Sequence, residues 1–234
     1  MSTPLHFSGT LNFAYLKRAI VVSFFLFASG VSFSQGKKTY LDLIFIGDIM
    51  QHGPQIRSAY NPAEDSYDYS SCFHYIAPSI RQADIAIANL EVTLAGPPYS
   101  GYPTFSSPDE LAAASKQAGI DVLVTANNHS LDRRKKGLER TIDVLDSLNM
   151  PHTGTFKNQA ERDQLYPLII EKKGIKIALL NYTYGTNGIP VTPPNVVNFI
   201  DTTLIKADIA KAIRLEADFT IVYFHWGYEY NSLP

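Results

Sequence analysis

Residues 121–132 read DVLVTANNHSLD, in which a short apolar run leads into two asparagines, a histidine and an aspartate. The same arrangement recurs at residues 41–48 (LDLIFIGD), 84–91 (DIAIANLE) and 219–227 (FTIVYFHWG). Segments with apolar residues at helical spacing separate these runs, an alternation that is typical of βαβ units around a mainly parallel sheet. We therefore predict an α/β fold with polar residues at the ends of its strands.

Five strands are predicted from runs rich in Ile, Val, Leu and Phe, at residues 41–46, 84–88, 121–125, 175–181 and 219–224. A sixth run, residues 166–171, is followed by Lys172-Lys173-Gly174 and then by the strand that starts at Ile175. This order predicts an antiparallel hairpin with a tight glycine turn. The predicted sheet arrangement is therefore mixed, although largely parallel.

Helix signals lie between the strands. Residues 107–110 (SPDE) predict a helix with Ser107 as its N-cap and proline at its first position, and Gly119 predicts the end of that helix. Two apolar stripes predict two further helices with these residues in the core: Leu138, Ile142 and Leu145, and Ile205, Ile209 and Ile213. The single cysteine, Cys72, is expected to pack as a small apolar residue on a helix.

Residues 1–34 have the order of an export signal. Lys17 and Arg18 precede the apolar stretch Ala19–Ala28, and small serines occupy the −3 and −1 positions of a cleavage site before Gln35. An uncleaved anchor is the alternative, although the apolar run is shorter than the roughly 20 residues that span a bilayer. The sequence therefore predicts an exported protein, either periplasmic, extracellular or associated with the cell envelope.

The remainder, residues 35–234, is expected to form one domain. It carries 18 basic and 22 acidic residues, a net charge of −4, because the leader holds two bases and no acid. No basic stripe is present to replace phosphate counterions, which argues against nucleic acid as a partner. Contact with a membrane is expected only through an uncleaved leader.

The polar residues at the strand ends predict a metal site. The carboxyl ends of parallel strands lie on one edge of a sheet, so Asp48, Glu91, Asn128, His129 and His225 are expected to converge in one crevice. Carboxylate oxygen together with imidazole nitrogen favours Zn, Mn or Fe over Mg or Ca. Singly, each residue has an ordinary alternative, such as a helix cap for Asp48 or a core position for His225. Their recurrence at four strand ends favours one shared site.

Four motifs also carry a resemblance to a known family. They are Gly47-Asp48-Ile49-Met50, Asn89-Leu90-Glu91, Asn127-Asn128-His129-Ser130-Leu131-Asp132 and His225-Trp226-Gly227-Tyr228-Glu229-Tyr230. In order and spacing they resemble the CapA family, named for poly-γ-glutamate capsule synthesis and similar to calcineurin-like metallophosphoesterases. The resemblance implies an α/β/β/α sandwich with a two-metal site at the strand ends.

The resemblance also implies a role for each residue. Asp48 and His225 would be metal ligands, Glu91 the bridging carboxylate, Asn128 the amide ligand, and His129 the catalytic group beside the leaving oxygen. The chain departs from the phosphoesterase pattern because it has no Asp-x-His opening. The family pattern also continues beyond His225, so we expect a domain truncated at its C-terminus, with ligands missing beyond the last residue.

The expected activity is metal-dependent hydrolysis of a phosphoester or amide in capsule or cell-envelope polymer metabolism, with an anionic polymer or a small phosphoester or amide as substrate. The alternative is a non-catalytic module for polymer synthesis, tethering or export on the same scaffold. The aromatic loop 96–105 either walls the crevice or packs on the domain surface. Trp226 is expected to be packed, with stacking on a ligand as the alternative. The basic run 133–136 is expected to be a solvated surface, with steering of an anionic polymer or phosphate as the alternative.

Overall fold

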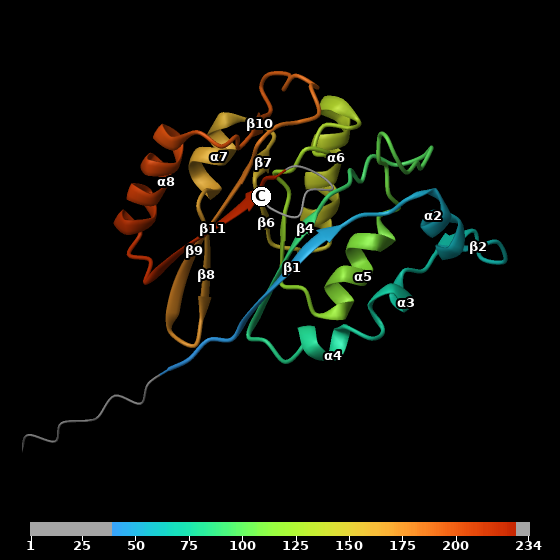
Figure 1. Ribbon diagram of the computed structural model, residues 1–234, viewed down its shortest axis with the longest axis horizontal. Coiled ribbons are helices and arrows are strands. Elements are labelled where there is room, and N and C mark those ends of the chain that lie inside the picture. The colour runs from blue at the N-terminus through green and yellow to red at the C-terminus, as the bar shows by residue number, and fades with distance from the viewer. Residues whose placement is uncertain (1–38, 228–234) are drawn as a thin grey trace, which may run out of the picture. The chain divides into compact units, whose positions relative to one another are not determined.

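Two β-sheets lie face to face at the centre of the computed structural model (Figure 1). The first sheet is parallel and has the strand order β1-β4-β5-β6, formed by Leu43–Ile49, Ile85–Leu90, Val122–Val124 and His152–Thr153. The second has the order β11-β9-β8, formed by Phe219–His225, Ile175–Thr183 and Leu168–Lys172. In it β9 pairs parallel with β11 and antiparallel with β8. The predicted hairpin and the mixed, largely parallel arrangement are therefore confirmed.

The structure describes residues 39–227, and the predicted leader, residues 1–34, lies outside this range. Residues 40–227 belong to one compact unit. Among the helices of the described range, none is both long and apolar enough to cross a membrane.

Helices cover the outer face of each sheet. Against the first sheet lie α5 (Glu110–Ala118) and α6 (Arg134–Ser147), together with the short helices α2 (Gly53–Ala59), α3 (Ser70–Phe73) and α4 (Ala77–Ile80). Against the second sheet lies α8 (Thr202–Arg214), with α7 (Gln159–Leu165) beside it. The layers therefore run α/β/β/α, as predicted. Short strands fill the connections: β2 (Tyr60–Asn61), β3 (Ser66–Tyr67), β7 (Thr155–Phe156) and β10 (Val196–Val197).

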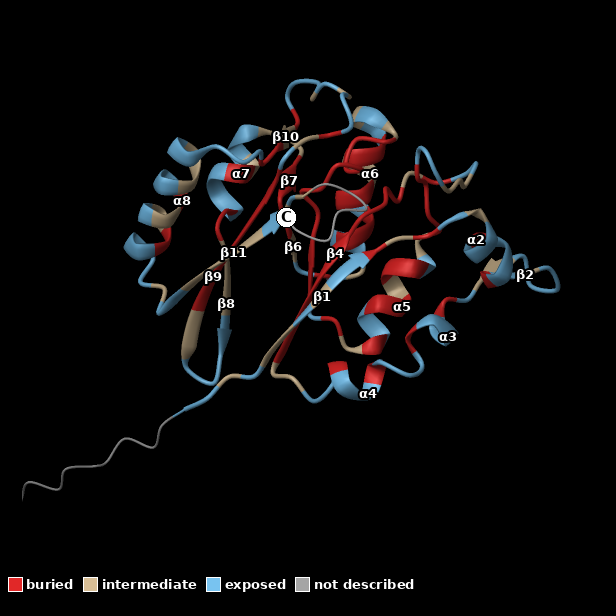
Figure 2. Ribbon diagram, viewed as in Figure 1, coloured by how far each residue is buried: buried red, intermediate tan, exposed pale blue. Residues whose placement is uncertain are grey.

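Strand β4 shows why the layers form. All six of its residues are buried (Figure 2), and successive side chains of a strand point to opposite faces. Ile85 and Ile87 pack between the sheets with side chains such as Leu179, whereas Ala86 and Ala88 pack toward the helices. Small residues on the helical side and large residues on the sheet side thus give β4 two different neighbours.

The two sheets also meet at their edge strands, β1 and β11. The Tyr223 hydroxyl of β11 donates a 3.0 Å hydrogen bond to the Ile46 carbonyl of β1, and burial raises the pKa of this tyrosine to about 12. A register shift follows at Gly47, which stands as an extra residue between the pairs of Ile46 and Asp48. The bulge and the tyrosine bond bring the ends of β1 and β11 to the same place.

Several local predictions are wrong. Ser107 is not the N-cap of α5, which begins at Glu110 directly after Asp109. Asp109 does not cap the helix with its side chain either, because its carboxylate is held by the guanidinium of Arg140 at 2.7 and 2.8 Å. Its end at Gly119, with φ of 110°, is confirmed. Ile213 was predicted to lie in the core, but it is 67% exposed, and Ala212 occupies the inner face of α8 instead.

One prediction of burial also fails outside the helical stripes. Cys72 is exposed on α3, because the buried position of this short helix belongs to Phe73. Strand β11 is apolar, yet in the described range it forms an edge of its sheet, with Phe219 and Phe224 exposed. An edge strand has only one neighbour to cover its backbone and side chains.

Candidate metal centre

The five predicted site residues lie in one crevice at the carboxyl ends of the strands. Asp48 belongs to β1, Glu91 follows β4, Asn128 and His129 follow β5, and His225 ends β11. The crevice has a volume of about 400 Å³, and it is lined by Asp48, Met50, His52, Glu91, Tyr102, Phe105, Asn128, His129, Tyr184, His225, Trp226 and Gly227. The topology therefore brings together side chains that are up to 177 residues apart in the sequence.

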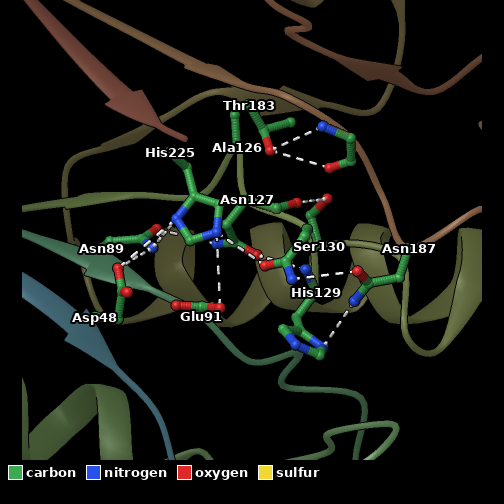
Figure 3. A network of polar contacts seen from close by, with 12 residues as sticks. Asp48, Asn89, Glu91, Ala126, Asn127, His129, Ser130, Thr183, Asn187 and His225 are labelled. Carbon is green, nitrogen blue, oxygen red and sulfur yellow. Dashed lines mark hydrogen bonds and ion pairs between the residues drawn. The ribbon is translucent and has the colours of Figure 1, made fainter. Parts of the chain in front are cut away.

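Asp48, Glu91 and His225 each offer a ligand atom, and these atoms all lie within 4.8 Å of one another (Figure 3). The His225 imidazole stands between the carboxylates, because its Nδ1 is 3.7 Å from Asp48 Oδ1 and its Nε2 is 3.7 Å from Glu91 Oε1. Asn128 adds an amide oxygen 2.9 Å from the same Nε2. A set of carboxylate, imidazole and amide donors fits a divalent ion such as Mn, Fe or Zn.

The Asp48 carboxylate is held in its ionised form. The His225 imidazole, 3.7 Å away, is the largest cause that lowers its pKa, to about 2, and a hydrogen bond from Asn89 adds to this effect against the opposing effect of burial. Asp48 therefore remains a carboxylate, the form that binds a cation, throughout the physiological pH range.

Two buried asparagines orient these groups, and neither was assigned a role from the sequence alone. Asn127 is fixed by the backbone, because its Nδ2 donates to the Leu90 carbonyl (2.8 Å) and its Oδ1 accepts from the His129 amide (3.1 Å). The same Nδ2 donates to Asn89 Oδ1 (3.0 Å). Asn89 must then turn its own Nδ2 outward, where it donates to Asp48 Oδ1 at 2.8 Å and lies 3.2 Å from His225 Nδ1.

The signal for these asparagines was present in the sequence. An amide at a fully buried strand end needs partners, because an unbonded buried polar group is costly. Asn89 and Asn127 are both 0% exposed. Which partners they find depends on the neighbouring strands, so their role in orienting the ligands appears only in the fold.

His129 is oriented by Asp132, three residues later. Its Nδ1 lies 2.8 Å from Asp132 Oδ2, and the same oxygen accepts a 2.6 Å bond from the Phe105 amide. The Phe105 ring meets the imidazole edge-on, with 4.6 Å between the ring centroids. A carboxylate at Nδ1 keeps the proton on that nitrogen, so Nε2 is the ring nitrogen available to a substrate.

Comparison with known proteins identifies the family of this chain. Residues 42–234 match the sequence profile described as "Bacterial capsule synthesis protein PGA_cap". The chain belongs to the PGA_cap family. The predicted CapA resemblance is thereby confirmed, and it extends over nearly all of the described residues.

Two curated relatives of the PGA_cap chain bear CapA names. The "Capsule biosynthesis protein CapA" of Bacillus anthracis is 26% identical over 206 residues, which cover 83% of this chain and 48% of the relative. The "PGA biosynthesis protein CapA" of Bacillus subtilis (strain 168) is 25% identical over 214 residues, covering 84% and 53%. The chain therefore spans about half the length of these relatives.

In this PGA_cap protein the aromatic loop 96–105 fits both expectations made for it. Phe105 is fully buried against His129, and Tyr102, 75% exposed, lines the crevice, so these residues form its wall. Tyr99 instead packs edge-on against Tyr67, with 5.2 Å between the ring centroids. The loop thus borders the site with one end and rests on the domain with the other.

Two residues that flank the motifs, Arg133 and Trp226, depart from the positions expected for them, and His52 adds a histidine that was given no role. Arg133, expected on a solvated surface, holds the aromatic loop, because its guanidinium donates to the Pro98 carbonyl and to Ser100 Oγ (3.2 and 2.6 Å). Trp226 is not packed as expected: it is 71% exposed and lines the crevice, the position that the alternative of stacking on a ligand requires. His52 lies outside the Asp-x-His spacing, yet it lines the same crevice, with its ring against Phe105.

Proposed function

We propose that this chain carries the metal site of a hydrolase that cleaves a phosphoester or amide bond in capsule or cell-envelope polymer metabolism. The observation that carries the proposal is the meeting of Asp48, Glu91 and His225, from three separate strands, with ligand atoms within 4.8 Å. A module that merely holds a polymer does not need two carboxylates and an imidazole at one point. The names of the relatives, both for capsule or PGA biosynthesis, support the choice of process.

Asp48, Glu91, Asn128 and His225 would hold the divalent cation. The bound ion supplies positive charge at the reacting centre and makes water an effective nucleophile near neutral pH. The buried Asn89 and Asn127 keep the Asp48 and His225 side chains in place before the ion arrives. Such supporting bonds typically change metal affinity or activity 10- to 100-fold when they are removed, by general experience with metal sites.

His129 would act as the proton donor to the leaving group. Asp132 holds the Nδ1 proton and stabilises the positively charged ring, so Nε2 can give its proton to the departing oxygen or nitrogen. The imidazole then becomes neutral, with Nδ1 still bonded to Asp132. Phe105 packs against the ring and limits its rotation. Proton donation of this kind contributes typically about 10²- to 10⁴-fold to the rate.

We also propose that the protein is exported. The order of basic residues, apolar run and small residues in positions 1–34 supports this part of the proposal. Fractionation of cells that express the full chain would locate it, and recovery of the protein entirely in the cytoplasm would contradict export.

Metal content decides the proposal most directly. The full chain, loaded with MnCl₂ and desalted, is compared by elemental analysis with Asp48→Ala and His225→Ala. Asp143→Ala serves as the matched control, because Asp143 is an exposed acid of α6 that does not line the crevice. We expect wild type and control to retain manganese and the two site variants to lose it. Equal, negligible metal in all four proteins would contradict the metal site.

Hydrolysis tests the second half of the proposal. A chromogenic phosphodiester and a chromogenic γ-glutamyl amide are each incubated with the manganese-loaded chain. Turnover that disappears in Asp48→Ala supports the hydrolase. Retained metal without turnover of either substrate would instead support the non-catalytic capsule module on the same scaffold.

A further inference from the structure

A tight turn between β9 and β10 places one more asparagine at the site. Residues 186–189 (TNGI) form the turn, in which the Ile189 amide donates to the Thr186 carbonyl at 2.9 Å. Asn187 and Gly188 both have positive φ, 50° and 73°. Two successive residues of positive φ are the mark of a type I′ turn, in which Asn-Gly is favoured. The turn backbone therefore sets where the Asn187 side chain points.

The Asn187 side chain reaches back to Asn128. Asn128 Nδ2 donates to Asn187 Oδ1 at 3.2 Å, and at its other end Asn128 Oδ1 lies 2.9 Å from His225 Nε2. Asn128 is only 3% exposed, so water has little access to either end of its amide. An amide bonded at both ends has one preferred orientation, because a flip would exchange donor and acceptor at each contact.

We propose that Asn187 is a positioning residue that orients the Asn128 amide with its oxygen toward the metal centre. This inference rests on the proposed metal site. An amide nitrogen has no lone pair to offer a cation, so the orientation of Asn128 decides whether this side chain can act as a ligand. The acceptor at Asn187 Oδ1 draws the NH₂ end toward the turn and leaves the oxygen facing His225.

Asn187 also approaches His129, but this contact is secondary. Asn187 Nδ2 lies 3.4 Å from His129 Nδ1, whereas Asp132 Oδ2 lies 2.8 Å from the same nitrogen. The shorter, charge-assisted contact keeps the Nδ1 proton, and at 3.4 Å the amide of Asn187 does not compete with it. Loss of the Asn187 side chain should therefore act on metal binding through Asn128 and leave the His129–Asp132 pair in place.

The turn offers a matched pair of substitutions. Asn187→Gly keeps a residue that adopts positive φ readily and removes the whole side chain. Asn187→Asp retains an acceptor for Asn128 Nδ2 and is also tolerated at positive φ. Pro190→Ala is the control, because Pro190 is an exposed neighbour in the same loop and is absent from the crevice lining.

Manganese affinity of the metal-free full chain, measured by isothermal titration calorimetry, tests the role. We expect Asn187→Gly to weaken binding about tenfold, within the range for residues that support metal ligands. Asn187→Asp should stay within about threefold of wild type, because the acceptor remains. Pro190→Ala should bind as wild type. Thermal unfolding in EDTA shows whether each variant is folded, and Asn187→Asp decides the case if the glycine variant is destabilised.

The outcomes separate this inference from the proposed function. Wild-type affinity in Asn187→Gly, with binding lost in Asp48→Ala, would overturn the positioning role and leave the metal site standing. Equal weakening in Asn187→Gly and Asn187→Asp would show that the acceptor is not the cause and would also overturn it. Wild-type affinity in Asp48→Ala would overturn the metal site, and the role of Asn187 with it.

Discussion

Replacing Asn127 with alanine should remove the part of the site on which the other side chains depend. The Asn127 side chain makes three hydrogen bonds, to the Leu90 carbonyl, to Asn89 Oδ1 and from the His129 amide, at 2.8, 3.0 and 3.1 Å. Asn127 is 0% exposed, so its side chain makes these bonds away from solvent. Asn127→Ala therefore removes one hydrogen-bond partner from each of three polar groups.

The size of the effect follows from these bonds. At a net contribution of about 1 kcal/mol each, their loss should lower the free energy of unfolding by about 3 kcal/mol. For a chain of this length, about 3 kcal/mol corresponds to a fall of roughly 6 to 12 °C in Tm. Asn89 also becomes free to turn away from Asp48, so manganese affinity should fall about 10- to 100-fold.

Urea unfolding in EDTA and calorimetric titration with manganese measure the two effects separately. Asn195→Ala is the control, because Asn195 is also buried and its Nδ2 donates to Glu139 and to the Lys157 carbonyl, away from the crevice lining. We expect Asn195→Ala to lower stability with no change in affinity. If Asn127→Ala binds manganese as wild type does, the buried amides do not orient the ligands and the reasoning is refuted.

Three further predictions concern stability, pH and catalysis. Arg162→Met should lower the free energy of unfolding in urea by about 3–5 kcal/mol, because it leaves the buried Asp208 carboxylate without the guanidinium 2.6 Å away. Adding Asp208→Leu should recover most of this loss, because it removes the unpaired charge. No recovery would argue against an uncompensated charge as the cause. The folded-state pKa of Asp48, about 2, lies below its ordinary value of 3.8. The ionised Asp48 carboxylate therefore contributes to stability above pH 3.8, and this contribution is lost as the pH falls through 2. The difference in the free energy of unfolding between wild type and Asp48→Asn should shrink over that interval. His129→Ala should lower the rate of phosphodiester hydrolysis by about 10²- to 10⁴-fold with manganese content unchanged, and an unaltered rate would remove the proton-donor role.

Secondary structure was predicted well where a local pattern decides it. The apolar run before Asn89 and the run before His129 are strands, and Gly119 ends a helix, because each of these features depends on neighbours in the sequence. The predictions that failed depend on distant partners. Ser107 does not cap α5, since the start of this helix is set by the Asp109–Arg140 pair, 31 residues apart in the sequence.

The sequence by itself determined that carboxylate, amide and imidazole side chains stand at the ends of several strands, and in a parallel sheet such ends share one edge. Only the tertiary structure decided the orientation of each group. Asn187 meets Asn128 across 59 positions, and Asn89 meets His225 across 136, through contacts that no local pattern encodes. The physical reason is that a side-chain amide takes its direction from the donors and acceptors around it, and folding assembles these from separate strands and turns.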